Sequence, residues 1–153
     1  MKRIKFLNCN LDLLTTNETI DFIDEKIKKN QFIQQVVINV AKLVNLQKDQ
    51  NLFKSVNESD LINIDGMGII YGARFLNFGV SKNHKVSGVD LFFQLIKLSE
   101  KKGYKVFLLG GTEDVIKLTN NNLLSKYPNL KIAGYHHGYF WDQEEQIVEK
   151  IKS

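Results

Sequence analysis

Two patterns of hydrophobic and polar positions alternate along this chain: short, continuous apolar runs and longer segments with helical periodicity. The apolar runs are rich in β-branched and large aliphatic residues, a composition typical of strands. They predict strands at Gln35–Val40, Leu61–Ile64, Tyr104–Leu109 and Leu130–Tyr135. The run at Tyr104–Leu109 is apolar enough to predict a strand that is buried on both faces.

Apolar residues at helical spacing fill the intervals between these strands and predict helices there. Two of the predicted helices follow candidate caps, at Thr15–Asn17 and at Asp142. The others are predicted at Ala41–Gln47, around Leu52–Val56, at Met67–Leu76, from Ser87 or Asp90 to Gly103, and from Thr112 to Tyr127. Strands that alternate with helices indicate a parallel sheet. We therefore expect an α/β fold, a Rossmann-like open parallel sheet with helices on both faces, formed by residues 1–153 as a single domain.

Composition and charge place the chain among ordinary globular proteins. Hydrophobic residues make up 43% of its 153 residues and charged residues 25%. A net charge of +4 fits an anionic ligand or an anionic membrane surface, and it fits a solvated lysine-rich exterior equally well. No feature predicts a nucleic-acid partner.

Cysteine content and the N-terminal sequence bear on the compartment. Cys9 is the only cysteine, so an intrachain disulfide is excluded and a reducing compartment is expected. Polar and charged residues interrupt residues 1–14, unlike a secretory signal peptide. No apolar run reaches the roughly 20 residues of a membrane span. We expect a cytoplasmic protein whose contact with the inner face of the plasma membrane, if any, is peripheral.

Asp65 is the first candidate for chemistry. It follows the predicted strand Leu61–Ile64 and precedes a glycine-punctuated helix, a place where open α/β sheets bind ligands. The backbone N–H groups at the start of that helix could hold a phosphate group. Asp65 is therefore either a general base beside a phosphorylated ligand or a carboxylate that caps the helix.

Glycines mark two further candidate sites. Gly66, Gly68 and Gly72 approximate a dinucleotide fingerprint, but Asp90 is poorly placed as its acidic partner, and close packing of the helix is the competing explanation. Gly110 and Gly111 form a second glycine turn after a strand, where backbone amides could hold a diphosphate or a sugar hydroxyl.

Other polar residues at strand ends are less informative. Asn39 either binds a ligand or only ends its strand. His136 and His137 are adjacent in a strand-like segment, so we expect their side chains on opposite faces and no shared metal. The sequence has no metal-binding spacing and no Asp-x-Asp pair, so we expect no metal and no cofactor. A leaving diphosphate would then depend on amides, helix ends or cations such as Arg74.

Six ordered sequence blocks together point to one family. They are Asn39–Lys42 (NVAK), Asp65–Gly68 (DGMG), Arg74, Val86–Leu91 (VSGVDL), Phe107–Gly111 (FLLGG) and Gly134–Phe140 (GYHHGYF). In order and spacing the series closely resembles the WecG/TagA/CpsF glycosyltransferases (glycosyltransferase family 26).

The resemblance implies an inverting, metal-independent transfer of a sugar, N-acetylmannosamine or a related hexose, from a UDP-sugar to an undecaprenyl-diphosphate-linked acceptor during synthesis of cell-surface polysaccharide or teichoic acid. It implies that Asp65 is the catalytic base. The substrate-binding residues it implies are Asn39, Gly66, Gly68, Arg74, Gly88, Asp90, Gly110, Gly111 and Tyr139.

Two departures from the family pattern keep an alternative open. Ile38-Asn39-Val40 stands where many members have a Thr-x-Asn block, and the family's C-terminal segment has no counterpart before Ser153. The resemblance thus covers the N-terminal portion of a family domain. The alternative is a truncated, non-catalytic member that binds nucleotide sugar or a partner subunit. An exposed edge strand would also favour a homo-oligomer.

Overall fold

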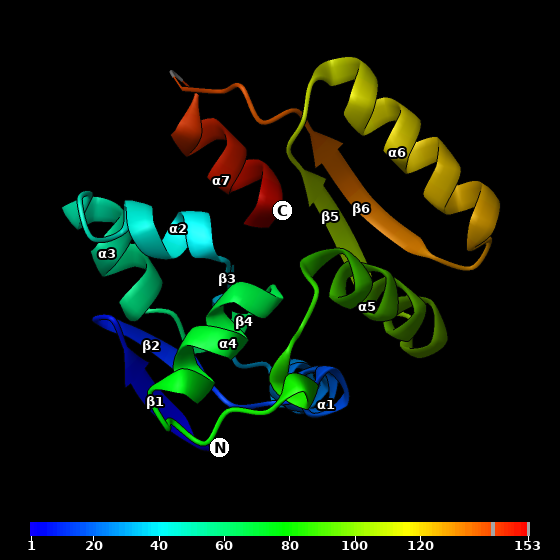
Figure 1. Ribbon diagram of the computed structural model, residues 1–153. Coiled ribbons are helices and arrows are strands. Elements are labelled where there is room, and N and C mark those ends of the chain that lie inside the picture. Colours follow the sequence, from blue (N-terminus) through cyan, green and yellow to red (C-terminus); the bar gives the residue numbers. More distant parts are fainter. Residues whose placement is uncertain (142, 153) are drawn as a thin grey trace. The chain divides into compact units, whose positions relative to one another are not determined.

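The computed structural model describes residues 1–141 and 143–152, which divide into two compact units. The first unit, Met1–Phe92, contains β1 (Arg3–Phe6), β2 (Cys9–Asp12), α1 (Thr16–Lys28), β3 (Gln35–Ile38), α2 (Val40–Asn45), α3 (Gln50–Asn57), β4 (Leu61–Ile64), α4 (Met67–Phe75) and a short 3-10 helix (Lys82–His84) (Figure 1). Helix α5 (Gly88–Lys102) crosses the boundary, and β5 (Lys105–Leu109), α6 (Glu113–Lys126), β6 (Lys131–His136) and α7 (Glu144–Lys152) follow it.

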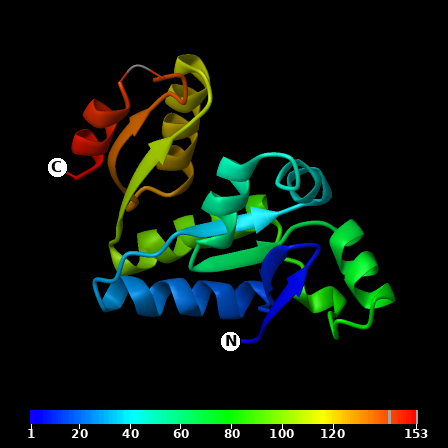
Figure 2. The same ribbon diagram turned by 90° about the vertical axis from the view of Figure 1, so that its left-hand side faces the viewer.

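The core of the first unit is a parallel pair of strands, β3 and β4. Gln35 pairs with Leu61 and Ile38 with Ile64, and Figure 2 shows the two strands as neighbouring arrows. Every residue of β4 is buried, because successive side chains enter opposite layers. Ile62 and Ile64 pack into a cluster with residues of α2, α3 and α4, whereas Asn63 donates a 2.9 Å hydrogen bond to Thr19 of α1. Helices therefore cover both faces of this pair.

An antiparallel hairpin, β1–β2, precedes the parallel strands and is missing from the sequence prediction. Its turn residues Leu7 and Asn8 have φ values of 46° and 61°, which match a two-residue hairpin turn with both central residues left-handed. The hairpin is tied to β4 by Asp12, which is fully buried. Its carboxylate accepts hydrogen bonds from the Arg3 side chain at 2.7 and 2.8 Å and from the backbone N–H of Ile62 at 2.8 Å.

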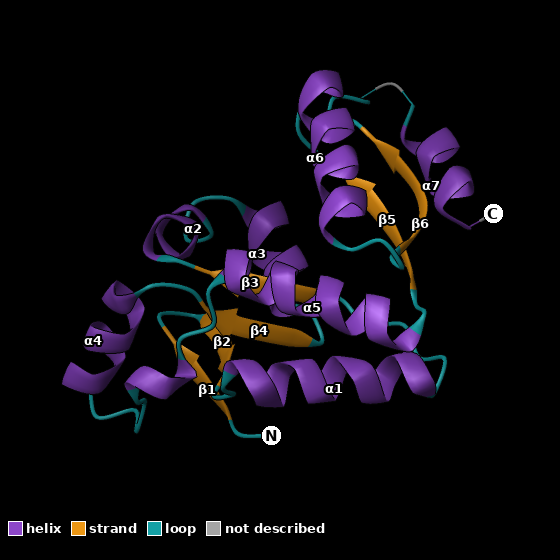
Figure 3. Cartoon of the chain, turned by 90° about the vertical axis from the view of Figure 1, so that its right-hand side faces the viewer, coloured by secondary structure: helices purple, strands orange, loops and turns teal. Residues whose placement is uncertain are grey.

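The second unit is built on another parallel pair, β5 and β6, with a register shift between Val106 and Phe107. Helices α6 and α7 lie on opposite sides of this pair (Figure 3). The prediction that the Tyr104–Leu109 run is fully buried is wrong: Lys105 is exposed, Leu109 is 45% exposed, and Leu108 is its one buried residue. Val106 and Phe107 are half-buried, so the strand is covered only in part, and β6 is its one partner strand within the described residues.

Several helix ends confirm the sequence prediction. Thr15 caps α1 in a capping box with Glu18, and Thr112 caps α6. Of the two candidate caps for α5, the structure selects Ser87, whose hydroxyl accepts from the N–H of Asp90 at 3.4 Å. Gly103 follows α5 with φ +73°, as a C′ glycine does. The predicted cap Asp142 lies outside the described residues.

The fold class predicted from the sequence is confirmed: parallel strand pairs alternate with helices in a Rossmann-like α/β arrangement. Several predicted boundaries differ by one or two residues from the observed ones. Val40, for example, begins α2 instead of ending β3. No helix in the described ranges combines the length and the apolarity that crossing a membrane requires.

Candidate active site

Asp65 lies at the carboxyl end of the buried strand β4, as the sequence predicts. Its N–H donates to the carbonyl of Ile38 at 2.8 Å, which continues the β3–β4 ladder by one residue. Because Ile38 and Ile64 are register partners, the next residues along the two strands, Asn39 and Asp65, are neighbours at the same edge. The strand is held in place by its buried neighbours, so the Asp65 backbone has little freedom to move.

The Asp65 carboxylate does not cap the helix that follows it. Residue Gly66 occupies the cap position of α4, with φ +104°, and no side chain bonds to that helix end. Asp65 Oδ2 instead accepts a 3.2 Å hydrogen bond from the N–H of Gly88, the first residue of α5. Within the described residues no donor contacts Oδ1, so this oxygen is available to a ligand.

Gly88 approaches Asp65 closely because it has no side chain. A Cβ atom at Gly88 would lie 3.5 Å from Asp65 Oδ2 and 3.3 Å from Cγ2 of Val37. The α5 start is therefore fitted against both the carboxylate and strand β3. Asp90 lies two residues further along α5 and is exposed.

Asn39 follows strand β3 as the N-cap of the next helix, and part of its side chain stays available. Its Oδ1 atom accepts from the N–H of Lys42 at 2.9 Å, so Asn39 is the N-cap of α2. Because a backbone N–H can only donate, the side-chain oxygen must face Lys42, and the amide NH₂ remains available as a donor. Asn39 is exposed, beside Asp65 in register.

The glycines of α4 serve helix packing. A Cβ atom at Gly68 would lie 2.6 Å from Cγ2 of Val40 on α2, and one at Gly72 would lie 3.3 Å from Cζ of Phe6 on β1. These contacts agree with the packing interpretation of the Gly-x-Gly pattern. Gly66 has a different role, since its positive φ permits the sharp change from strand to helix.

Arg74 is not brought to the strand ends. It lies in the last turn of α4, seven residues beyond Met67, which is about 10 Å along the helix axis. Its side chain is exposed. Arg74 was grouped with Asp65 because both belong to the ordered series of sequence blocks, and that order does not determine the distance between them in the fold.

The remaining predicted residues form their own cluster in the second unit, at the carboxyl ends of β5 and β6. Gly110 and Gly111 turn from β5 into α6 with φ values of +135° and +69°. The loop after β6 packs on this turn: the N–H of Gly138 donates to the Gly111 carbonyl at 2.9 Å, and a Cβ at Gly138 would lie 3.2 Å from Cα of Gly110. Tyr139 follows, 63% exposed.

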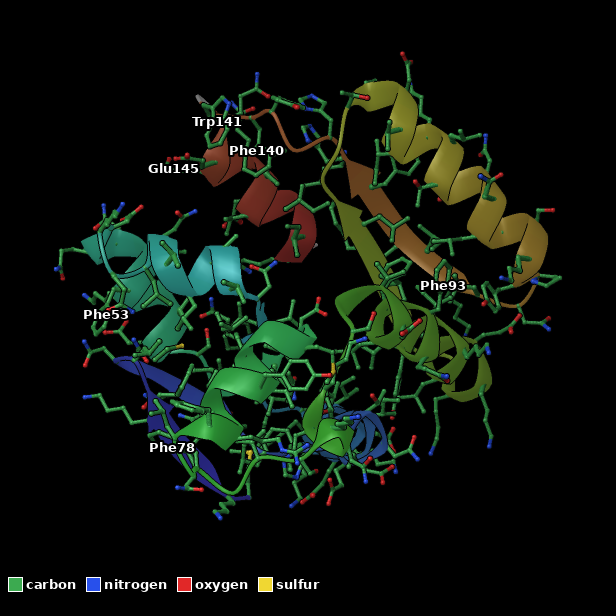
Figure 4. The ribbon with its side chains drawn as sticks, viewed as in Figure 1. Phe53, Phe78, Phe93, Phe140, Trp141 and Glu145 are labelled. Carbon is green, nitrogen blue, oxygen red and sulfur yellow. The ribbon has the colours of Figure 1, made fainter. Side chains whose placement is uncertain are left out.

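The two adjacent histidines lie together, against the sequence expectation. The ring centroids of His136 and His137 are 4.3 Å apart, and Phe140, labelled in Figure 4, meets His136 edge-on at 6.0 Å. The alternation rule fails because His137 lies beyond the end of β6. No group of three or more potential metal-ligating side chains occurs in the described part of the chain.

An ion pair between Lys117 and Glu113 lies on the first turns of α6, after the glycine turn. A hydrogen bond from Lys117 lowers the pKa of Glu113, and electrostatic interaction with His137 and His136 contributes in the same direction. The same bond raises the pKa of Lys117. Glu113 therefore places negative charge at the start of α6.

An apolar groove that was not predicted from the sequence borders Gly68 in the first unit. This groove has a volume of about 450 Å³ and lies between the β1–β2 hairpin, α2 and α4. Its walls include Phe6, Leu7, Val40 and Val44, the last two one helical turn apart and each 50% exposed. The spacing of Val40 and Val44 was the available signal, but the predicted boundary assigned Val40 to a strand and Val44 to the helix after it.

Comparisons with known proteins agree with the block series. The profile of the Glycosyl transferase WecG/TagA/CpsF family matches residues 4–153. The N-acetylglucosaminyldiphosphoundecaprenol N-acetyl-beta-D-mannosaminyltransferase of Bacillus subtilis (strain 168) is 32% identical over 146 residues, which cover 92% of this chain and 52% of that protein. The protein of the same name from Staphylococcus aureus (strain NCTC 8325 / PS 47) is 31% identical over 103 residues, which cover 67% of this chain and 39% of that protein.

The matches show which family the chain belongs to, although they cover only part of the length of each relative. The chain spans about half the length of the Bacillus subtilis protein and less of the Staphylococcus aureus protein. The family match, in contrast, extends over nearly all of the chain and includes both clusters of predicted residues. The resemblance drawn from the ordered blocks is thereby confirmed, and the chain belongs to the WecG/TagA/CpsF family of glycosyl transferases.

Proposed function

We propose that this chain carries the general base of an inverting, metal-independent glycosyltransferase. The observation that supports it best is the Asp65 carboxylate at the end of β4, positioned by one backbone hydrogen bond from Gly88 and left with an available oxygen. In the proposed reaction, Asp65 takes the proton of the acceptor hydroxyl as that oxygen attacks the anomeric carbon. A positioned base of this kind contributes on the order of 10² to 10⁴ in rate.

The proposed donor is a UDP-sugar, with N-acetylmannosamine or a related hexose as the transferred group. The uncapped N–H groups at the start of α4 lie directly after Asp65 and are suited to the diphosphate, whose charge they would help to stabilise as UDP leaves. The NH₂ group of Asn39, at the same edge, is a donor for a sugar or diphosphate oxygen. Gly110, Gly111 and Tyr139 are proposed as further substrate contacts.

The proposed acceptor is a sugar linked to undecaprenyl diphosphate. The relatives from Bacillus subtilis and Staphylococcus aureus carry that acceptor in their names, and we extend it to this chain. We further propose that the protein works in the cytoplasm at the inner face of the plasma membrane, bound peripherally and as a homo-oligomer. All of residues 1–153 would then belong to one catalytic domain.

Transfer assays with defined substrates test the proposal. The protein, and a version extended to the length of its relatives, would be incubated with UDP-N-acetylmannosamine or UDP-glucose and a short-chain polyprenyl-diphosphate-N-acetylglucosamine. We expect Asp65→Asn to lower kcat at least 10²-fold while binding of UDP is retained. Asp21→Asn, which removes an exposed carboxylate from α1, is the matched control.

Three outcomes would contradict the proposal. Transfer by Asp65→Asn at the wild-type rate would exclude Asp65 as the base. UDP binding without transfer in either length of protein would favour a non-catalytic member that binds nucleotide sugar. Saturable binding of NAD(H), measured as a thermal shift, would indicate that the Gly66–Gly72 pattern forms a dinucleotide site instead.

A further inference from the structure

Two adjacent histidines at the end of β6 contact backbone groups in opposite hydrogen-bonding roles. His136 Nδ1 lies 2.8 Å from the carbonyl oxygen of His137, and His137 Nδ1 lies 3.1 Å from the backbone nitrogen of Tyr139. A carbonyl oxygen only accepts, so His136 must carry a proton on Nδ1. A backbone N–H only donates, so Nδ1 of His137 must be unprotonated. The two contacts thus assign the proton positions of both rings.

Protonation of the rings affects these two contacts differently. A cationic imidazole carries a proton on each of its nitrogens. His136 keeps its contact in either charge state, because its Nδ1 is protonated in both. His137 keeps its contact only while the ring is neutral, because a proton on Nδ1 would face the N–H of Tyr139. The contact with Tyr139 is therefore lost when His137 becomes charged.

The backbone of Tyr139 depends on this contact. Within the described residues, no other acceptor contacts its N–H. The preceding residue is held separately, because the N–H of Gly138 donates to the Gly111 carbonyl at 2.9 Å. The side chain of Tyr139 is 63% exposed, so packing restrains it weakly. The ring nitrogen of His137 thus orients the backbone that carries the Tyr139 ring.

The charged groups that act on His137 come from α6 and β6. Glu113 interacts electrostatically with both histidine rings, and its carboxylate is paired with Lys117 at 2.9 Å. The ring centroids of His136 and His137 are 4.3 Å apart. The turn at residues 109–112, on which the loop after β6 packs, has no titratable side chain. Glu113 therefore attracts a charged His137, whereas a charged His136 repels it.

We propose that His137 is a positioning residue for Tyr139 and holds it ready for ligand only while the imidazole is neutral. This inference rests on the proposed function, in which Tyr139 contacts substrate, and it adds a charge-dependent control of that contact. Histidine is the side chain that changes charge between about pH 5 and 8. Binding of the UDP-sugar donor should therefore weaken as the pH falls through that range, because the Tyr139 backbone is released.

Three variants separate the hydrogen bond from the histidine ring. His137→Asn places an amide oxygen where Nδ1 lies, and asparagine favours a bond from the N–H two residues further on at any pH. His137→Phe keeps a ring and removes the acceptor. His84→Asn is the matched control, because His84 Nδ1 accepts from the N–H of Ser81 at 3.1 Å, a contact of the same kind in the first unit.

Calorimetric titration of the whole chain with UDP, between about pH 5 and 8, measures the effect on ligand binding. UDP itself titrates in this range, so each affinity is divided by that of His137→Asn at the same pH. For the wild type and for His84→Asn, this ratio should fall about three- to tenfold from the highest to the lowest pH. For His137→Phe the ratio should be low throughout.

NMR of the ring nitrogens and amide exchange test the contact without ligand. At the highest pH the wild type should carry the His136 proton on Nδ1 and the His137 proton on Nε2, and its Tyr139 amide should exchange more slowly than in His137→Phe. Equal exchange in these two proteins, or a wild-type UDP ratio that does not change with pH, would overturn the role of His137. UDP binding by no variant at any pH would instead overturn the proposed donor site, and the exchange comparison would still decide the contact.

Discussion

Replacing Gly68 with alanine tests why a glycine stands at this position of α4. An added Cβ atom would lie 2.6 Å from Cγ2 of Val40, whereas non-bonded carbon atoms prefer about 3.5 to 4.0 Å. Either Val40 leaves its rotamer or α2 moves away by about 1 Å. Overpacking of this kind costs about 1 to 3 kcal/mol, and the better helix propensity of alanine offsets up to about 1 kcal/mol. We expect Gly68→Ala to lower the free energy of unfolding by about 1 kcal/mol.

A double-mutant cycle isolates the cause of that loss. In a Val40→Ala background the atom that clashes is absent, so Gly68→Ala should be neutral or slightly stabilising, and the coupling energy should reach about 1 to 3 kcal/mol. Val44→Ala is the matched control, because Val44 lines the same groove but does not approach the Gly68 position within 4 Å. In that background Gly68→Ala should be as costly as in the wild type.

Urea unfolding followed by far-ultraviolet circular dichroism measures all of these variants. A coupling energy below about 0.5 kcal/mol between Gly68→Ala and Val40→Ala would refute the packing explanation. UDP titration of the stable double variant then asks a separate question. Weakened binding there, without a loss of stability, would show that Gly68 also contacts ligand.

Three further predictions concern the positioning of β4 and its neighbours. Gly88→Ala should lower kcat about tenfold or more with a small change in stability, because the new methyl group lies 3.5 Å from Asp65 Oδ2; an unchanged kcat would show that this fit is unimportant. Asp12→Ala should lower the free energy of unfolding by about 3 kcal/mol in urea titrations, because it leaves Arg3 and the Ile62 N–H without their buried acceptor, and a loss below 1 kcal/mol would contradict that role. Burial raises the pKa of the Cys9 thiol from 9.0 to about 11. Its contribution to stability is therefore complete below pH 9 and lost as the pH rises towards 11, so Cys9→Ala should lose less stability than the wild type over that range.

Local sequence signals predicted much of the secondary structure. The run Leu61–Ile64 became a strand because four consecutive apolar or amide residues can be buried on both faces, and Thr15, Ser87 and Thr112 capped helices as their side chains favour. The β1–β2 hairpin escaped prediction because its turn, Leu7-Asn8, lacks the glycine that usually marks such turns. Exposure of Leu109 escaped prediction because burial of a strand depends on what packs against it.

For the candidate site, the sequence by itself determined the family and which residue types follow each strand. Order and spacing of short blocks were sufficient, since both are properties of the chain. Only the tertiary structure decided what each residue contacts: that Asp65 accepts from Gly88 instead of capping α4, that Asn39 caps α2 through its oxygen, and that Arg74 lies at the far end of its helix. The same is true of Gly111 and Gly138, which are distant in sequence and meet because parallel strands bring their carboxyl ends together. Such contacts depend on strand pairing and helix direction, and no local pattern of the chain contains that information.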